Sequence, residues 1–212
     1  MGQYKKVNLS EKFDLSARPL DRGATEGAQV EWHLAREQGD AYGDALEHAT
    51  QLAAGESGER RTGDYWITYL LDSPRRIYTW AEGKPNWHEP EGANLYVGIA
   101  VRDATDGRFI PAMSVGVTLI DGAGKVVGAG EQSLVWDPLA HQYGRNWQVH
   151  GAGPHSMYVR IEPPSSVQPD QAATGQAMRP LEVEFADLDL TLRQPSGRGA
   201  RSVVTVPEQD SL

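Results

Sequence analysis

The sequence contains no cysteine among its 212 residues. It therefore has no disulfide, thiolate zinc site, iron–sulfur cluster or cysteine nucleophile, and any metal site must use His, Met, Asp, Glu or backbone ligands. Basic residues are also few, because 20 Lys and Arg stand against 29 Asp and Glu, a net charge of −9. Nonspecific nucleic-acid binding needs clustered Lys and Arg, so we expect no nucleic-acid partner.

Long apolar runs are missing as well. No segment approaches the roughly 18 apolar residues of a membrane span, and residues 1–15 lack the apolar stretch of a signal peptide. We therefore expect no membrane span. The sequence as it stands predicts a cytoplasmic location, and a periplasmic or extracellular one if a signal has been removed from a mature exported protein.

Period-two alternation of apolar and polar residues is the main pattern that is present. It is typical of half-buried strands and occurs in residues 64–71, 97–101, 115–119, 157–161 and 181–185. Turn residues at Asp121–Gly124 predict a hairpin that joins residues 114–120 to residues 125–129. Numerous short strands linked by turns predict an all-β, immunoglobulin-like antiparallel sandwich.

Two segments near the start of this domain complete the organisation. Alternation in residues 30–35 predicts a strand with Glu31 and His33 on one face. Helical spacing in residues 40–54 predicts a short inserted helix, followed by a polar loop at 55–63. We expect an extended N-terminal segment at 1–27, the sandwich domain at 28–192 and a flexible tail at 193–212.

Enzyme motifs are absent from the sequence. It has no Gly-x-Ser-x-Gly, Walker A, Rossmann fingerprint or His-Glu-x-x-His. The six histidines are therefore the main candidates for chemistry. His141 stands out because it begins the specific-looking run HQYGRN at 141–146. An outward histidine on a strand such as His33 is more often a surface residue than a ligand.

An ordered set of residues resembles a known family. The set comprises His33, Tyr69, DGRFIPAM at 106–113, HQYGRN at 141–146 and YVRIEPP at 158–164. It resembles the periplasmic iron-transport proteins that bind copper or iron at a His/Met/carboxylate site on an immunoglobulin-like sandwich. The resemblance implies a homodimer and an as yet unknown metal-transport partner protein.

The resemblance implies a metal site made by His33, Met113, His141 and Glu31. Imidazole with thioether suits copper, especially Cu(I), and an added carboxylate admits iron. The ligand set is only partly retained, because Gln142 directly precedes Tyr143 where the family has histidine. The family's further histidine is also missing near residues 168–170.

Two other functions stay open. In the first, the chain is a metal-free interaction or binding module that has lost the family site, and the missing ligands favour this hypothesis. Alternatively, it is an enzyme of specialised metabolism that uses Tyr143, Arg145 and His141 on an organic substrate. No nucleophile or base constellation supports catalysis, so we expect a protein that is not an enzyme.

Overall fold

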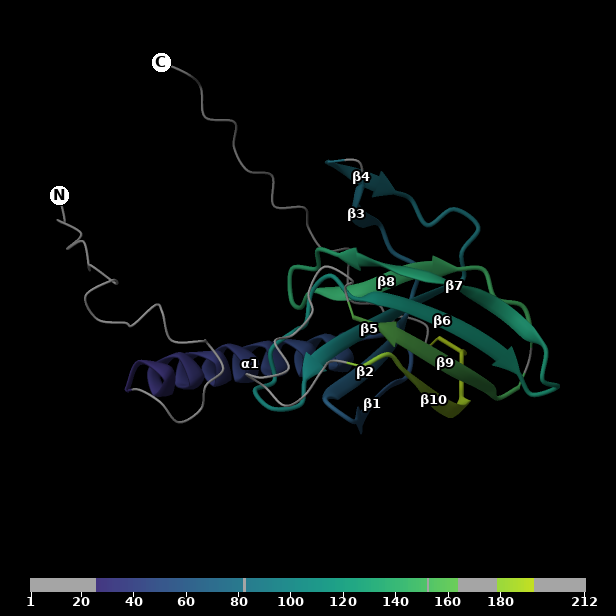
Figure 1. Ribbon diagram of the computed structural model, residues 1–212. Helices are drawn as coiled ribbons and strands as arrows, with labels where there is room; N and C mark the ends of the chain where they lie inside the picture. The colour runs from purple at the N-terminus through teal and green to yellow at the C-terminus, as the bar shows by residue number, and fades with distance from the viewer. Residues whose placement is uncertain (1–25, 82, 152, 164–178, 193–212) are drawn as a thin grey trace, which may run out of the picture.

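The computed structural model describes residues 26–81, 83–151, 153–163 and 179–192. The predicted tail at 193–212 and nearly all of the predicted N-terminal segment lie outside the described residues. One helix and ten strands make up the described part (Figure 1). They are α1 (Glu26–Leu52), β1 (Ser57–Thr62), β2 (Tyr65–Asp72), β3 (Ile77–Ala81), β4 (Lys84–His88), β5 (Leu95–Asp103), β6 (Ser114–Asp121), β7 (Val126–Val135), β8 (Gln142–Trp147), β9 (His155–Glu162) and β10 (Leu181–Leu188). The all-β class with a helix is confirmed.

The strands pair antiparallel in the order β1-β2-β5-β8-β7-β6-β9-β10. Strand β7 belongs to both sides of the sandwich. Its first part pairs with β6 up to Gln132, and its last residues, from Ser133, pair with β8. The result is a sandwich that is nearly closed into a barrel. The β3–β4 hairpin stands off this path and touches it through the pair Thr79 and Val135 (Figure 1).

The main core lies between the two sides of this sandwich. Inward-facing residues of β2, β5, β6, β9 and β10 are buried there, among them Ile67, Ile99, Val117, Val159 and Phe185. Strands β2 and β5 are buried on both faces, since seven consecutive residues of β5 are buried. A strand covered on both sides needs a second layer over its outer face.

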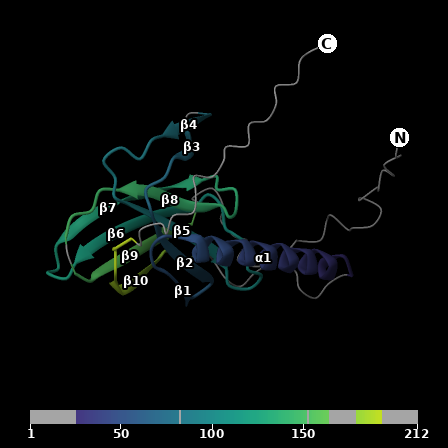
Figure 2. The same cartoon turned by 180° about the vertical axis from the view of Figure 1, so that it is seen from behind.

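Helix α1 supplies part of this second layer. Leu46 of α1 is 3% exposed and packs with Ala100 of β5 and Ala140. The N-terminal half of the helix extends beyond the edge of the sandwich in both views (Figures 1 and 2). Within the described residues, no helix combines the length and the apolar character needed to cross a bilayer.

The helix corrects two expectations from the sequence. The predicted strand at residues 30–35 is wrong, because these residues belong to α1, and the helix begins at Glu26 rather than near residue 40. The apolar residues that suggested a strand are exposed, with Val30 at 41% and Leu34 at 53%. The buried stripe consists of Ala35, Gly39 and Leu46, which recur at helical spacing.

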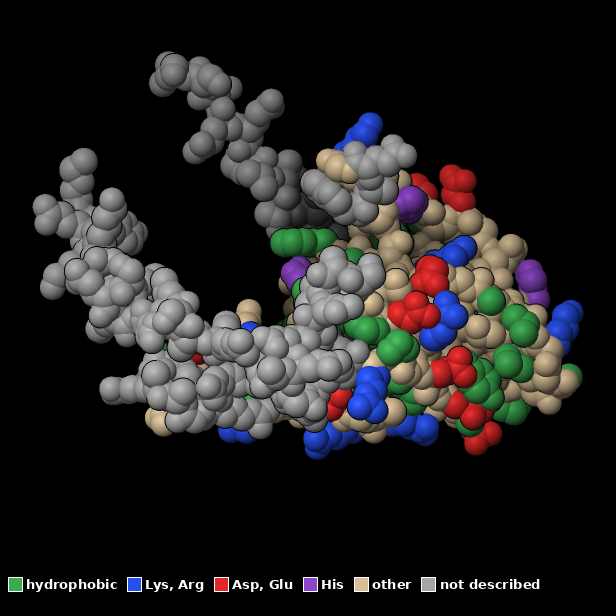
Figure 3. All heavy atoms as spheres, viewed as in Figure 1, with side chains coloured by type: hydrophobic (Ala, Val, Ile, Leu, Met, Phe, Trp, Pro, Cys, Tyr) green, Lys and Arg blue, Asp and Glu red, His purple; other side chains and the backbone are tan. Residues whose placement is uncertain are grey.

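The remaining strand predictions are confirmed for β2, β5, β6, β9 and β10, and the hairpin at Asp121–Gly124 joins β6 to β7. The predicted loop at 55–63 is wrong in large part, because it contains β1. The run that follows His141 forms strand β8. Acidic and basic side chains intermingle on the face seen in Figure 3.

Candidate functional site

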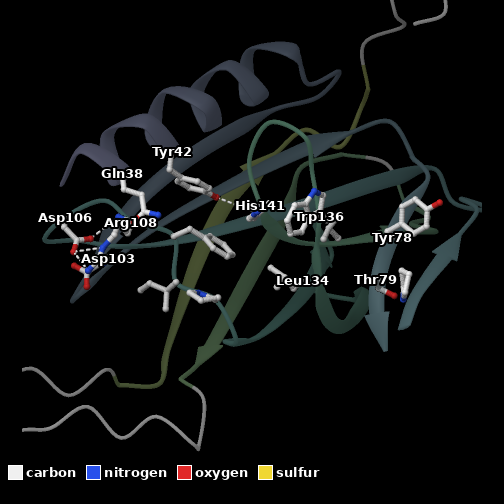
Figure 4. Close-up of a pocket in the computed structure, with 15 residues that line it drawn as sticks. Gln38, Tyr42, Tyr78, Thr79, Asp103, Asp106, Arg108, Leu134, Trp136 and His141 are labelled. Carbon is white, nitrogen blue, oxygen red and sulfur yellow. Dashed lines mark hydrogen bonds and ion pairs between the residues drawn. The ribbon is translucent and has the colours of Figure 1, made fainter. Parts of the chain in front are cut away.

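A cavity of about 870 Å³ opens between α1, the β3–β4 hairpin and the end of β7. Figure 4 shows side chains from all of these elements turned toward it. The residues that line it are Gln38, Tyr42, Tyr78, Thr79, Pro85, Asp103, Asp106, Arg108, Phe109, Ile110, Pro111, Leu134, Val135, Trp136 and His141. Ligand sites in proteins commonly have this volume and a mainly apolar lining.

Large apolar side chains in the cavity wall are exposed to solvent. Trp136 is 77% exposed, Tyr78 is 51% exposed and Leu134 is 45% exposed. The Trp136 ring lies against the His141 ring, with 4.5 Å between the centroids. Clustered exposed apolar groups of this size mark binding sites more often than single ones do.

Tyr42 connects the helix to the cavity wall. Its hydroxyl donates a hydrogen bond to the His141 carbonyl oxygen, and its ring lies 5.5 Å from that of Phe109. Burial raises the pKa of Tyr42 well above its usual value. The phenol therefore stays protonated and keeps donating, which anchors α1 over this end of β8.

Tyr143 supports the floor of the cavity from the core side. It is 1% exposed, and its ring lies 5.5 Å from Phe109. Its hydroxyl donates to the Ile110 carbonyl at 2.8 Å and accepts from the Met113 N–H at 2.9 Å. Desolvation raises its pKa to about 12. The loop from Phe109 to Met113 is thus fixed by one buried tyrosine.

One end of the cavity is polar. The Arg108 Nε and Nη2 atoms both donate to Asp106 Oδ2, at 3.0 and 2.8 Å. The Asp106 side chain is only 2% exposed, so this ion pair is partly dry. Asp103 lies beside it, and its Oδ1 atom accepts a hydrogen bond from the Thr105 N–H at 2.7 Å. Gln38 extends from α1 toward the same end (Figure 4).

Two of the four predicted metal ligands lie on α1. His33 is 72% exposed, and its Nε2 atom lies 3.2 Å from Glu37 Oε1, one helical turn away. Glu31 is half-buried on the same helix. At 1.5 Å per residue, His33 lies about 14 Å along the helix axis from Tyr42, which contacts His141.

The other two predicted ligands lie closer to the sandwich but in different environments. Met113 is 5% exposed and belongs to the main core, whereas His141 is half-buried in the cavity wall. The Nδ1 atom of His141 is buried and has no hydrogen-bond partner among the described residues. His33, Glu31 and Met113 do not line this cavity, so the four predicted ligands do not meet in it.

A metal does not fit this arrangement well. Across residues 26–192, apart from the gaps in the described ranges, no three His, Asp or Glu side chains are grouped so that they would hold an ion. Tyr143 is buried in the core, and Arg145 lies over the Trp147 ring at 5.1 Å. The enzyme hypothesis needs both residues beside His141, and neither of them lines the cavity.

Sequence reasoning missed most of the cavity wall. Tyr78, Leu134 and Trp136 line the cavity, and none of them is among the candidate site residues that the sequence indicated. The signal that could have found them is the local sequence LVW at 134–136, whose strand pattern continues to a tryptophan just before a Pro-containing turn. His88 ends strand β4, and its Nε2 lies 2.8 Å from Thr79 Oγ1.

No family model matches the sequence, and no curated protein sequence matches it either. Thirteen chains of solved structures do match the fold. One is FetP from uropathogenic Escherichia coli strain F11, with 17% identity, a TM-score of 0.53, and coverage of 66% of this chain and 96% of that one. A copper-bound variant of the same FetP has 18% identity, a TM-score of 0.54, and coverage of 70% and 97%.

A copper-bound variant of Campylobacter jejuni P19 is similar to the same extent. It has 12% identity and a TM-score of 0.53, and the match covers 66% of this chain and all of that one. At identities this low, these structural matches establish likeness of fold alone. The resemblance expected from the ordered motifs is thereby confirmed at that level, and this chain shares the fold of FetP and P19.

Proposed function

We propose that this chain is a binding protein whose cavity beside Trp136 and His141 takes a small organic ligand with an apolar body. The observation that carries the proposal is the cavity itself, about 870 Å³ in volume and walled by exposed aromatic and aliphatic side chains. This is the metal-free reading of the sandwich. The separation of the predicted metal ligands among an exposed helix, the core and the cavity wall supports it.

The energetic argument rests on apolar surface left in water. Trp136 is 77% exposed, and an aromatic side chain of this kind offers roughly 150–250 Å² for burial. A ligand that covers about 100 Å² of it gains about 2.5 kcal/mol from that residue alone. Leu134 and Tyr78 add similar contacts from β7 and β3.

Titration with Nile red, a neutral apolar dye that fluoresces when shielded from water, tests this function. We expect saturable one-to-one binding that weakens about tenfold or more in Trp136→Ala. Val126→Ala is the matched control, because Val126 is 51% exposed at the opposite end of β7. Absence of saturable binding, or equal loss in both variants, would overturn the proposal.

Copper or iron binding is the second candidate, and the copper-bound FetP and P19 structures of the same fold favour it. In this case His33, Met113, His141 and Glu31 would supply imidazole, thioether and carboxylate donors, which suit copper and admit iron. Their donor atoms would have to approach within about 2.0–2.5 Å of one ion. This requires α1 to bring His33 to His141.

Metal analysis of the purified protein by mass spectrometry, with and without added copper and iron, separates the two candidates. Metal binding predicts stoichiometric copper or iron that falls in His33→Ala and in His141→Ala. His48→Ala is the control, since His48 is an exposed residue of the same helix. The metal-free reading predicts no stoichiometric metal in a folded protein.

The second candidate brings further proposals with it. A protein of iron-uptake type would form a homodimer, act in the periplasm after export and pass its metal to a transport partner. The FetP structure came from protein expressed in the periplasm, which supports this location. Light scattering after size-exclusion chromatography tests the dimer, and a single-chain mass at micromolar protein would exclude it.

A further inference from the structure

The cavity is elongated and its two ends differ chemically. Figure 4 shows Asp103, Asp106, Arg108 and Gln38 at one end, Tyr78 and Thr79 at the other, and Trp136 between them. A ligand that fills it would have an apolar body beside the aromatic residues. Its polar group, if it has one, would lie at the end near Asp103.

The charges at the polar end do not cancel. Arg108 binds Asp106 through two side-chain nitrogens, so this pair is neutral as a unit. Arg102, the next residue along β5 from Asp103, pairs with Glu59. The Asp103 carboxylate makes no ion pair with any described residue, and its side chain accepts a hydrogen bond only from the Thr105 backbone N–H within the described part of the chain. Counting the described residues alone, this end therefore carries one carboxylate without an ion-pair partner.

The aromatic lining has the same electrostatic preference. Trp136, Tyr78, Tyr42 and Phe109 line the wall, and the face of an aromatic ring is electrically negative. Such faces attract a cation within about 6 Å of the ring centre. An anionic ligand would be repelled by the carboxylate and would gain no such attraction from the rings.

Resting on the proposed function, we propose that the ligand is an organic cation: an amine or quaternary ammonium group on an apolar chain or ring. The cationic group lies at the Asp103 end, where a partly shielded carboxylate attracts it more strongly than in bulk water. The apolar body lies along Leu134 and Trp136. The neutral Asp106–Arg108 pair walls this end and gives it a fixed shape.

Displacement of Nile red by three eight-carbon compounds tests the charge preference. The compounds are octyltrimethylammonium, octanol and octyl sulfate, at concentrations below micelle formation and in 20 mM and 150 mM salt. We expect the ammonium compound to bind at least tenfold more tightly than octyl sulfate at low salt. The preference should shrink at the higher salt, because screening weakens an exposed ion pair.

Asp103→Asn removes the charge but keeps an oxygen that accepts from the Thr105 N–H. We expect this variant to reduce the cation preference to about twofold or less. Glu182→Gln is the charge-matched control, because Glu182 is exposed on β10, away from the cavity. It should leave the preference unchanged.

The outcomes separate the inference from the function beneath it. Equal displacement by all three compounds, or the strongest displacement by octyl sulfate, would overturn the cation proposal and leave organic-ligand binding intact. Loss of Nile red binding in the wild-type protein would overturn both. If Asp103→Asn does not fold, the wild-type order of displacement at 150 mM salt still decides, because the long-range attraction of the chain's net charge of −9 is largely screened there and a preference for the ammonium compound that remains is local.

Discussion

Replacement of Gly39 by alanine tests how closely α1 approaches the loop that lines the cavity. A Cβ atom at Gly39 would lie 1.8 Å from the Asp106 carbonyl oxygen, whereas real Cβ contacts stay beyond 3.0 Å. The obstacle is backbone, so the helix or the loop must shift. Overpacking of this kind costs about 1–3 kcal/mol, and the better helix propensity of alanine returns about 1 kcal/mol.

Because a 1.8 Å approach to backbone places the cost in the upper part of this range, we expect Gly39→Ala to lower the free energy of unfolding by about 1–2 kcal/mol. Urea denaturation followed by circular dichroism measures this change. In a domain of this size, each kcal/mol corresponds to a fall in Tm of roughly 2–4 °C. Since Tyr42 lies one turn further along the helix and contacts His141, Nile red binding should weaken together with stability.

Gly43→Ala is the matched comparison, because Gly43 lies one turn away on the same helix. Its added Cβ would lie 3.3 Å from Arg102 Nη1, the end of a flexible side chain that can move aside. We expect this variant to gain up to about 1 kcal/mol from helix propensity. Gly39→Ala as stable as the wild type, or equal losses in both variants, would refute the close approach of helix and loop.

Three further predictions concern the buried polar groups of the sandwich. Gln132 pairs with Val115 across the sheet and is 5% exposed, and neither of its side-chain polar atoms is bonded to a described residue. Gln132→Met should therefore raise the free energy of unfolding by about 1–2 kcal/mol. A lower urea midpoint than in the wild type would contradict this. Tyr143→Phe leaves the Met113 N–H and the Ile110 carbonyl without their hydrogen bonds to the hydroxyl, and each loss should lower the free energy of unfolding by about 1–3 kcal/mol. An unchanged Tm in calorimetry would disprove these two hydrogen bonds. Because burial raises the pKa of Tyr143 to about 12, above the unfolded value of about 10, its stabilisation is complete below pH 10 and is lost as the pH rises toward 12. Urea midpoints from pH 9 to 12 should fall in the wild type and fall less steeply in Tyr143→Phe.

The central strands could be predicted because their residues alternate locally. Val97, Ile99 and Val101 point from β5 into the core of the sandwich, and any sheet with one buried face would bury them in the same way. The edge elements could not be predicted so well. Strand β1 reads SGERRT and pairs with β2 alone, so its side chains remain largely in water and carry no apolar pattern.

Helix α1 was misjudged because its buried stripe is made of small residues. Ala35 and Gly39 carry little hydrophobicity, yet they are the residues buried there, while Val30 and Leu34 face solvent. The pattern of apolar residues therefore indicated a strand. Close backbone approach at Gly39 positions this part of the helix, and Leu46 packs against Ala100 and Ala140 further along it.

The motif order in the sequence by itself determined the sandwich class and the likeness of fold to the copper-binding family, because strands and turns leave local signatures. It also singled out His141, which does line the cavity. Only the tertiary structure decided what surrounds that histidine. The cavity wall joins α1, β3, β7 and the loop at 104–113, which are far apart in the chain. Which side chains meet there depends on strand register and helix placement, and neither is written in any local stretch of residues.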